Sequence, residues 1–471
     1  MKNIVHYRGL VSRERNIINL ERLLYQKVTE SKPKPKIKFS NQFQQMTDNI
    51  KEHLNQEQYR ELLKDSFGNK LKQNKLREVI YSKVSSPSFL KSFSAQLADY
   101  KLDYVTNVLV EKITGLDVLQ GLTEVDTITD INCIDWNNIW VDDIYKGTYK
   151  TDISFESEQD YLDLCNRFAF ASGKQYSMSK PSVDAVFPHL RVNFVGQDLS
   201  PKVSLQIRVI SKELRLSEKF MLETGYANQL MIDFLKATFL TESHLISGAT
   251  GTGKTELLRY FLKYTADNGN MIVIEDTPET YLDELYPYKP IKMWKNREAL
   301  DGEKNEFGYS YHIRNAMRQH PRYIIIQESR GKESWDVLKA VETGHVVNTT
   351  LHSESAIDSI DRFIDLCEEA QHHEAEYYGK RITRKFKLGI HTKRYGKKQV
   401  RKISQIVEYE TYENNEVKAN VLFEYDHISQ KHIQKGRVST KLWNRLLEAH
   451  EDLSNLSALA PTDQKVKIRT A

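Results

Sequence analysis

Hydrophobic positions change their spacing along the chain, and each spacing predicts a different kind of element. From about residue 44 to 112, apolar residues recur mostly three and four apart, which is typical of amphipathic helices. Between about 127 and 210, short β-rich runs surround a helical stretch at 157–172, which predicts an α+β domain. After Glu213, helices and strands alternate to about residue 370, the rhythm of a parallel sheet with helices on both faces.

The two ends of the chain differ from these regions. The first 40 residues finish in alternating proline and lysine, which prevents a helix and favours an extended, solvated linker. Strand-like runs at 405–409 and 420–425 precede an amphipathic helix at about 439–450, and we expect a flexible tail after Pro461. The predicted regions are a basic segment at 1–40, a helical region at 41–120, an α+β domain at 121–212, an α/β domain with closing strands and helices at 213–455, and a tail at 456–471.

Composition suits a soluble protein of several domains. The 471 residues exceed what one ordinary core organises, and 39% hydrophobic with 28% charged residues fits globular cores better than a membrane-embedded body. No run of about 18 apolar residues occurs and the N-terminus lacks a signal-peptide core, so we expect a cytoplasmic location. The three cysteines lie far apart, so neither a disulfide framework nor a thiolate zinc site is indicated.

Positive charge is concentrated in two places. Residues 1–95 hold an excess of Lys and Arg over Asp and Glu within a chain whose net charge is only +4, and a second basic stretch runs from Lys380 to Lys402. Either stretch is compatible with nucleic acid, an acidic partner or a phosphate-rich membrane surface. A solvated basic face is the plainer interpretation of both.

A glycine-rich loop at residues 248–255 carries the most specific chemistry. It matches Gly-x4-Gly-Lys-Thr in full, with a strand-like run before it and a helix after it. Its glycines let backbone N–H groups point at phosphate oxygens, Lys254 adds charge at the β- and γ-phosphates, and Thr255 offers a hydroxyl to Mg²⁺. The predicted nucleotide-binding residues here are Gly248, Ala249, Thr250, Gly251, Thr252, Gly253, Lys254, Thr255 and Glu256.

Two apolar strands downstream end in acids, at the edge where α/β proteins place their ligands. The first ends in Glu275 and Asp276, with Glu279 close behind, and these carboxylates are candidates for holding Mg²⁺ or polarising the attacking water. The second ends in Glu328, which fits a general base that orients water. Arg330 follows it and is a candidate for compensating the negative charge of the nucleotide or of a neighbouring acid. The plainer interpretation of the first strand end is a solvated turn, and that of the second is a surface ion pair.

Two histidines flank the next predicted strand, His345 before it and His352 after it. Their position after the predicted base suggests a γ-phosphate sensor or a relay between base and nucleotide. A lone histidine is more often a polar core residue. A metal site is not favoured, because no third ligand stands nearby.

The order of these motifs resembles the type II/type IV secretion ATPase superfamily, the hexameric cytoplasmic motors of pilus assembly, secretion and conjugation. A Walker A loop at 248–255, an acidic box at 274–279, a Walker B segment at 314–331 and a histidine box at 343–352 follow the family order, within a similarity covering roughly 96–426. The resemblance implies a RecA-like P-loop ATPase domain with a parallel sheet, ATP and Mg²⁺, a hexamer, and inner-membrane platform proteins as partners.

The resemblance also extends upstream of the loop. Residues 183–193 and 204–208 are similar to the segment before the family's ATPase domain, which implies that Arg191 and Arg208 reach the nucleotide. The helical N-terminal region and residues 113–122 look most like the tight-adherence pilus and conjugation branch.

Some positions depart from the family pattern. Arg322 stands where the family usually has Asp, and Gln327 where it has Gly, directly before Glu328. The added bulk of Gln327 bears on the hydrolysis rate more than on nucleotide binding. Residues 187–190 replace the usual Asp-Gly-Ser before the upstream arginine.

Three functions stay open on the sequence. The first is a hexameric Mg²⁺-dependent ATPase motor that serves a membrane-associated secretion, conjugation or pilus machine. The second is a translocase ATPase that grips nucleic acid through its basic stretches. The third is a nucleotide-gated scaffold with little turnover.

Overall fold

The computed structural model describes residues 41–462 apart from 68, 98–99, 197–198, 297–306 and 397–398. This part of the chain forms two compact units. One contains the described residues up to Arg60 together with Asn74–Ile113, and the other contains Glu61–Gln73 and the described residues from Thr114 onwards. The predicted basic segment at 1–40 and most of the predicted tail lie outside the described residues.

The N-terminal part of the chain is helical, as its apolar spacing predicts. Met46, Ile50 and Leu54 lie on one face of a helix and are fully buried. Ser86 caps a later helix by accepting a hydrogen bond from the N–H of Phe89. The helices here are α2 (Asn41–Leu54), α3 (Glu57–Ser66), α4 (Lys70–Val84), α5 (Pro87–Ser92), α6 (Ser94–Leu97), α7 (Leu102–Thr114) and α8 (Gln120–Thr123).

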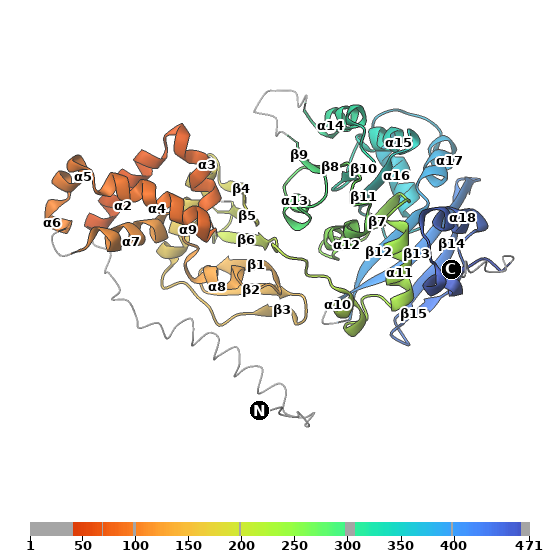
Figure 1. Ribbon diagram of the computed structural model, residues 1–471. Helices are drawn as coiled ribbons and strands as arrows, with labels where there is room; N and C mark the ends of the chain where they lie inside the picture. Colours follow the sequence, from red (N-terminus) through yellow and green to blue (C-terminus); the bar gives the residue numbers. More distant parts are fainter. Residues whose placement is uncertain are drawn as a thin grey trace, which may run out of the picture. The chain divides into compact units, whose positions relative to one another are not determined.

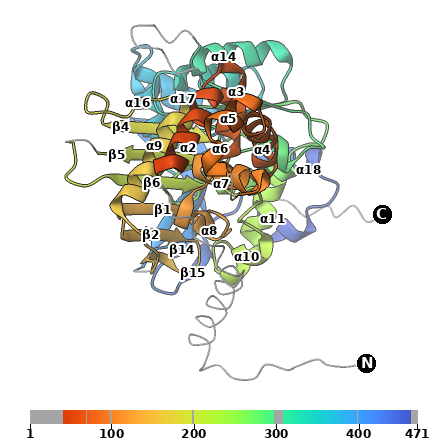
Figure 2. The ribbon, with the colours of Figure 1, turned by 90° about the vertical axis from the view of Figure 1, so that its left-hand side faces the viewer.

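A six-stranded antiparallel sheet and one long helix follow, which confirms the predicted α+β fold. The strand order is β3-β2-β1-β6-β5-β4, and Figure 2 shows β4, β5, β6, β1 and β2 in succession. Arg191 and Arg208 lie directly opposite each other on β5 and β6, on the less buried face. The elements are β1 (Ile128–Asp135), β2 (Asn138–Asp143), β3 (Gly147–Lys150), α9 (Glu158–Ser172), β4 (Ser182–Phe187), β5 (Leu190–Val195) and β6 (Ser204–Val209).

A nine-stranded sheet forms the centre of the α/β domain, in the order β15-β14-β13-β12-β7-β11-β10-β8-β9. Neighbours from β12 to β9 run parallel, as predicted. The strands β13, β14 and β15 are antiparallel, because short turns connect them. The bounds are β7 (His244–Ser247), β8 (Met271–Glu275), β9 (Ile291–Lys295), β10 (Tyr323–Ile326), β11 (Val346–Leu351), β12 (Leu388–Tyr395), β13 (Val400–Glu413), β14 (Glu416–Asp426) and β15 (Lys431–Gln434).

Helices cover both faces of this sheet (Figure 1). Met271 and Val273 of β8 therefore pack into one apolar cluster with α11, α12 and α18, while Ile272 and Ile274 pack into a second with α14, α15, α16 and α17. None of the described helices is long and apolar enough to cross a membrane. The helices are α10 (Glu218–Glu223), α11 (Gln229–Thr238), α12 (Lys254–Phe261), α13 (Leu282–Leu285), α14 (Tyr309–Ala316), α15 (Ser334–Glu342), α16 (Ser359–Glu368), α17 (Ala375–Lys385) and α18 (Thr440–Ala449).

Candidate nucleotide site

The phosphate loop joins the end of β7 to the start of α12, at the carboxyl edge of the parallel strands. Gly248, Gly251 and Gly253 have φ angles of +146°, +73° and +97°, which glycine adopts without strain. A Cβ atom at Gly248 would also lie 2.3 Å from the carbonyl oxygen of Thr392. The helix α12 starts at Lys254 without a side-chain cap, so its first N–H groups can bind an anion.

The threonines of the loop have different surroundings. Thr250 is exposed, as is Ala249 beside it. The buried hydroxyl of Thr252 donates to the carbonyl oxygen of Ala249 at 2.8 Å and accepts from the hydroxyl of Thr392 at 2.9 Å. Thr252 therefore shapes the loop with its side chain and leaves only its backbone to face a ligand.

The first turn of α12 carries two further predicted residues. Thr255, the residue predicted to offer a hydroxyl to Mg²⁺, lines the cavity beside the loop. Glu256 also lines it, but its carboxylate accepts hydrogen bonds from the backbone N–H of Arg215 at 2.6 Å and from Arg259 at 2.8 Å. The Glu256 side chain thus fixes the segment at Arg215, which precedes α10, to the first turn of α12.

Lys254 reaches back over its own loop. Its Nζ donates to the carbonyl oxygens of Gly248 at 2.7 Å and Ala249 at 3.1 Å, and lies 3.3 Å from Nδ1 of His352. Burial, with the like charge of two nearby arginines, lowers the pKa of Lys254 to about 8 against the attraction of Glu328. The cation is held by uncharged carbonyls, which are weaker partners than a phosphate.

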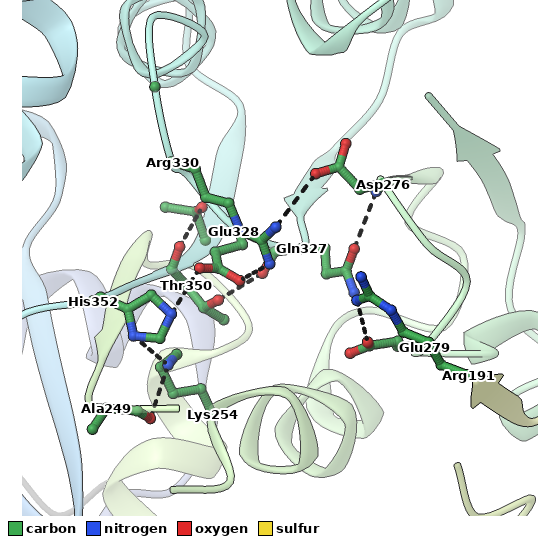
Figure 3. A network of polar contacts seen from close by, with 12 residues as sticks. Arg191, Ala249, Lys254, Asp276, Glu279, Gln327, Glu328, Arg330, Thr350 and His352 are labelled. Carbon is green, nitrogen blue, oxygen red and sulfur yellow. Dashed lines mark hydrogen bonds and ion pairs between the residues drawn. The ribbon is translucent and has the colours of Figure 1, made fainter. Parts of the chain in front are cut away.

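Glu328 follows β10 and is the centre of a polar network (Figure 3). Nη2 of Arg330 donates to its Oε2 at 2.6 Å, and Nε2 of His352 lies 2.9 Å from its Oε1. Burial works to raise the pKa of Glu328, but the hydrogen bond from Arg330 and the surrounding positive charges hold it below its ordinary value. Glu328 is therefore an ionised carboxylate. Nδ1 of His352 also lies 3.0 Å from the carbonyl oxygen of Gly248, so the ring stands between the loop and Glu328.

The two predicted histidines lie at opposite ends of β11. Nδ1 of His345 lies 2.9 Å from the carbonyl oxygen of Pro321, and His345 does not line the cavity. The six residues of β11 separate it from His352, a span of roughly 23 Å over seven residue steps. The structure brings His352 to the loop and leaves His345 away from it.

The acids of the acidic box face different ways. The buried carboxylate of Glu275 accepts the backbone N–H groups of Glu279 at 3.2 Å and Thr280 at 2.9 Å. Burial raises the pKa of Glu275 to about 7 against these hydrogen bonds. Asp276 lies 3.9 Å from Arg330. Neither Glu275 nor Asp276 lines the cavity, whereas Glu279 does, so the structure does not bring the two predicted magnesium ligands to the loop.

Glu279 is the point where the upstream arginines meet the α/β domain. Nη1 of Arg191 lies 3.7 Å from its Oε1, and Nη1 of Arg208 lies 3.8 Å from the same oxygen. Each arginine also faces an acid of its own sheet, Asp184 at 3.5 Å and Asp130 at 3.3 Å. Both line the cavity, so the structure places the two predicted arginines beside the nucleotide loop.

Gln327, the residue before the candidate base, points away from the cavity. Its buried side chain accepts the backbone N–H of Asp276 at 3.1 Å, as Figure 3 shows. The Gln327 side chain, which was expected to add bulk beside Glu328, instead connects the Walker B strand to the acidic box.

The oxygen donors at the cavity fit a magnesium ion that is bound together with a nucleotide. The hydroxyl of Thr255 and the carboxylates of Glu279 and Glu328 all line the cavity. Among the described residues no group of three or more His, Cys, Asp or Glu side chains forms a metal site by itself. Mg²⁺ at a nucleotide takes only one or two protein ligands and completes its shell with phosphates and water.

The cavity itself has a volume of about 440 Å³, which is in the range of small-ligand sites. Beside the charged residues it has an apolar wall from three separate segments, which the sequence analysis missed because no local motif joins them. Its members are Ile144, Tyr145, Leu216, Phe220, Tyr226 and Val400.

Two further arginines contact the loop and were predicted only as part of a basic stretch. Arg394 donates from Nε and Nη2 to the carbonyl oxygen of Gly251 at 3.0 and 2.7 Å, and Nε of Arg401 donates to the same oxygen at 2.9 Å. They lie opposite each other on β12 and β13. The sequence shows a glycine turn between two strand-like runs, but not that β12 lies beside β7.

Comparison with known proteins agrees with the motifs. The family model described as type II/IV secretion system protein matches residues 183–441. An uncharacterized protein of Bacillus anthracis is 33% identical over 323 residues, which is 66% of this chain and 71% of the relative. A candidate conjugal transfer protein of Mycobacterium tuberculosis is 29% identical over 251 residues, 50% of this chain and 68% of the relative. The X-ray structure of the Legionella pneumophila ATPase DotB matches with a TM-score of 0.45 and 20% identity, over 66% of this chain and 81% of that chain.

The matched residues run from the segment carrying Arg191 through the phosphate loop, acidic box, Walker B strand and histidine box to the closing strands. This extent is more than half of the chain. The chain therefore belongs to the type II/IV secretion system protein family, as the order of its motifs predicts.

Proposed function

We propose that the protein is a Mg²⁺-dependent ATPase motor of a membrane-associated secretion, conjugation or pilus machine, and that it works as a homohexamer on inner-membrane platform proteins at the cytoplasmic face. Family membership supports a secretion motor ATPase in general. The observation that carries the proposal is the contact series Lys254, His352 and Glu328, placed beside the phosphate loop in the cavity.

Catalysis in this proposal is electrostatic positioning. Lys254 leaves the loop carbonyls and binds the β- and γ-phosphates, while Glu328 accepts a hydrogen bond from water and orients it for attack. Arg191 and Arg208 supply positive charge from the N-terminal sheet as negative charge develops on the phosphoryl group. Thr255 would hold Mg²⁺, which would neutralise part of the negative charge of the phosphates.

The test is steady-state phosphate release by the purified protein with two variants. Lys254→Ala should lose nucleotide binding, and Glu328→Gln should bind ATP but hydrolyse it roughly 100- to 1000-fold more slowly. Lys263→Ala and Glu354→Gln are matched controls, because both residues are exposed and neither lines the cavity. If the Lys254 and Glu328 variants hydrolyse ATP as fast as the controls, the proposal is wrong.

Oligomeric state can be measured on the same samples. Native mass spectrometry with and without ATP should show a six-subunit species, and a monomer at all nucleotide concentrations would contradict the ring. The scaffold alternative predicts such rings with negligible phosphate release, so the two measurements together separate it from the motor.

The translocase alternative has less support from the second basic stretch. Lys380 forms an ion pair with Glu376 at 2.7 Å, Lys385 donates to the carbonyl oxygen of Glu342 at 3.1 Å, and Lys402 donates to that of Thr224 at 2.5 Å. These cations are engaged within the protein. Steeply salt-dependent DNA binding with stimulated ATPase activity would restore the alternative.

A further inference from the structure

The hairpin of β12 and β13 brings two positive charges onto one uncharged atom. Both Arg394 and Arg401 donate to the carbonyl oxygen of Gly251, at distances of 2.7 to 3.0 Å. The approach is close, since a Cβ atom at Gly251 would lie 2.5 Å from Nη2 of Arg394. The two guanidinium groups therefore converge at the middle of the phosphate loop.

The acids Asp130 and Asp142 act on Arg401 only through space, without an ion pair. Within the described part of the chain neither arginine forms an ion pair with an acid, whereas Arg191, Arg208 and Arg330 each lie within 4 Å of a carboxylate. Arg401 lines the cavity, and Arg394 reaches the loop from beside it. Burial and the charge of Arg394 lower the pKa of Arg401. The pair thus concentrates positive charge that an anionic ligand at the loop would compensate more closely than these acids do.

The lysine of the loop is held in a similar way. Lys254 donates to the carbonyl oxygens of Gly248 and Ala249, and the arginines donate to that of Gly251. All three cations rest on uncharged oxygens of one loop. A phosphate oxygen carries negative charge and a carbonyl oxygen does not, so a phosphate attracts these cations more strongly than the carbonyls do.

We infer that Arg394 and Arg401 form a second phosphate-binding element of the nucleotide site, which transfers from the Gly251 carbonyl to the phosphates of ATP or ADP. The inference rests on the proposed function, because it assigns more residues to the same ligand. Binding then pulls on the β12–β13 hairpin as well as on α12, so the closing strands respond to the nucleotide directly.

The test measures the affinity of the full-length protein for ADP by calorimetry at several salt concentrations. Arg394→Gln and Arg401→Gln should each weaken binding roughly tenfold. The double variant should also show a shallower dependence of affinity on salt, because fewer charges meet the phosphates. Lys393→Gln is the matched control, since it removes the same charge from an exposed neighbour on the same strand.

Two outcomes would overturn the inference. One is a double variant that binds ADP as tightly as the control. The other is weaker binding with an unchanged salt dependence, which would mean that the arginines only hold the loop. As a further control, Arg394→Lys and Arg401→Lys keep the charge, so they should restore the salt dependence if these side chains bind phosphate. A failure of the unaltered protein to bind any nucleotide would instead overturn the proposed function.

Discussion

Raising the pH should weaken nucleotide binding, because Lys254 must be charged to bind a phosphate. In this structure the pKa of Lys254 is lowered from 10.5 to about 8, mainly by burial. A bound phosphate raises that pKa again, so binding takes up a proton whenever the lysine starts neutral. The contribution of the lysine is therefore fully present below about pH 8 and is lost as the pH rises through that value.

The size of the effect follows from the charged fraction of the lysine. With a pKa of about 8, roughly three quarters of the side chains are charged at pH 7.5 and roughly 3% at pH 9.5. If only the charged form binds, affinity should fall roughly 25-fold across this interval. A lysine with its ordinary pKa would give almost no change over the same range.

The assay is calorimetric titration with ADP between about pH 7.5 and 9.5, where the second ionisation of a phosphate group, near 6, is complete. Repeating the titration in buffers of different ionisation enthalpy measures the protons taken up, which should approach one per site above pH 8. Lys254→Arg is the matched control, since its guanidinium stays charged throughout and its affinity should stay level. A level affinity in the unaltered protein, without proton uptake, would refute the reasoning.

Three other substitutions probe different parts of the structure. His352→Ala should lower kcat about 100-fold with a smaller change in KM, because its ring lies between the loop lysine and the candidate base; an unchanged kcat in steady-state assays would contradict a role for the ring. Tyr281→Phe removes the hydroxyl that accepts the N–H of His189 at 3.0 Å, and should lower the free energy of unfolding in urea by about 1 kcal/mol; no change would mean that water replaces the bond. Phe234→Ala empties a fully buried site and should cost about 3 to 5 kcal/mol in the same titration, whereas exposed Leu447→Ala should cost much less.

Local features of the fold were readable from the sequence. The helix predicted at 157–172 is α9, which begins after Ser157 and ends before Gly173 in the left-handed conformation, because both caps are encoded beside the helix itself. The phosphate loop is predictable for the same reason, since its glycines, lysine and flanking elements are adjacent in the chain. The parallel sheet followed from alternating elements.

Contacts between distant segments were not readable in this way. Nothing local distinguishes the strand end that carries His345 from the end that carries His352, and only the position of the loop decides which one contacts Lys254. Glu275 looks like a ligand on the sequence, yet it turns inward because the following backbone N–H groups need an acceptor. Arg401 on β13 reaches the loop because β13 pairs with β12, and β12 pairs with β7. The strand β7 lies more than 140 positions earlier in the chain than its partner β12.

The alternating packing of β8 divides the ATPase domain into two layers that respond to genetic change separately. A cavity made at Ile272 loosens the layer of α14 to α17, and one made at Val273 loosens the layer of α11, α12 and α18. Because stability effects couple mainly between residues in contact, compensating mutations should come from the same layer as the defect. Suppressor selections started from these two adjacent codons would then recover two sets of mutations with little overlap.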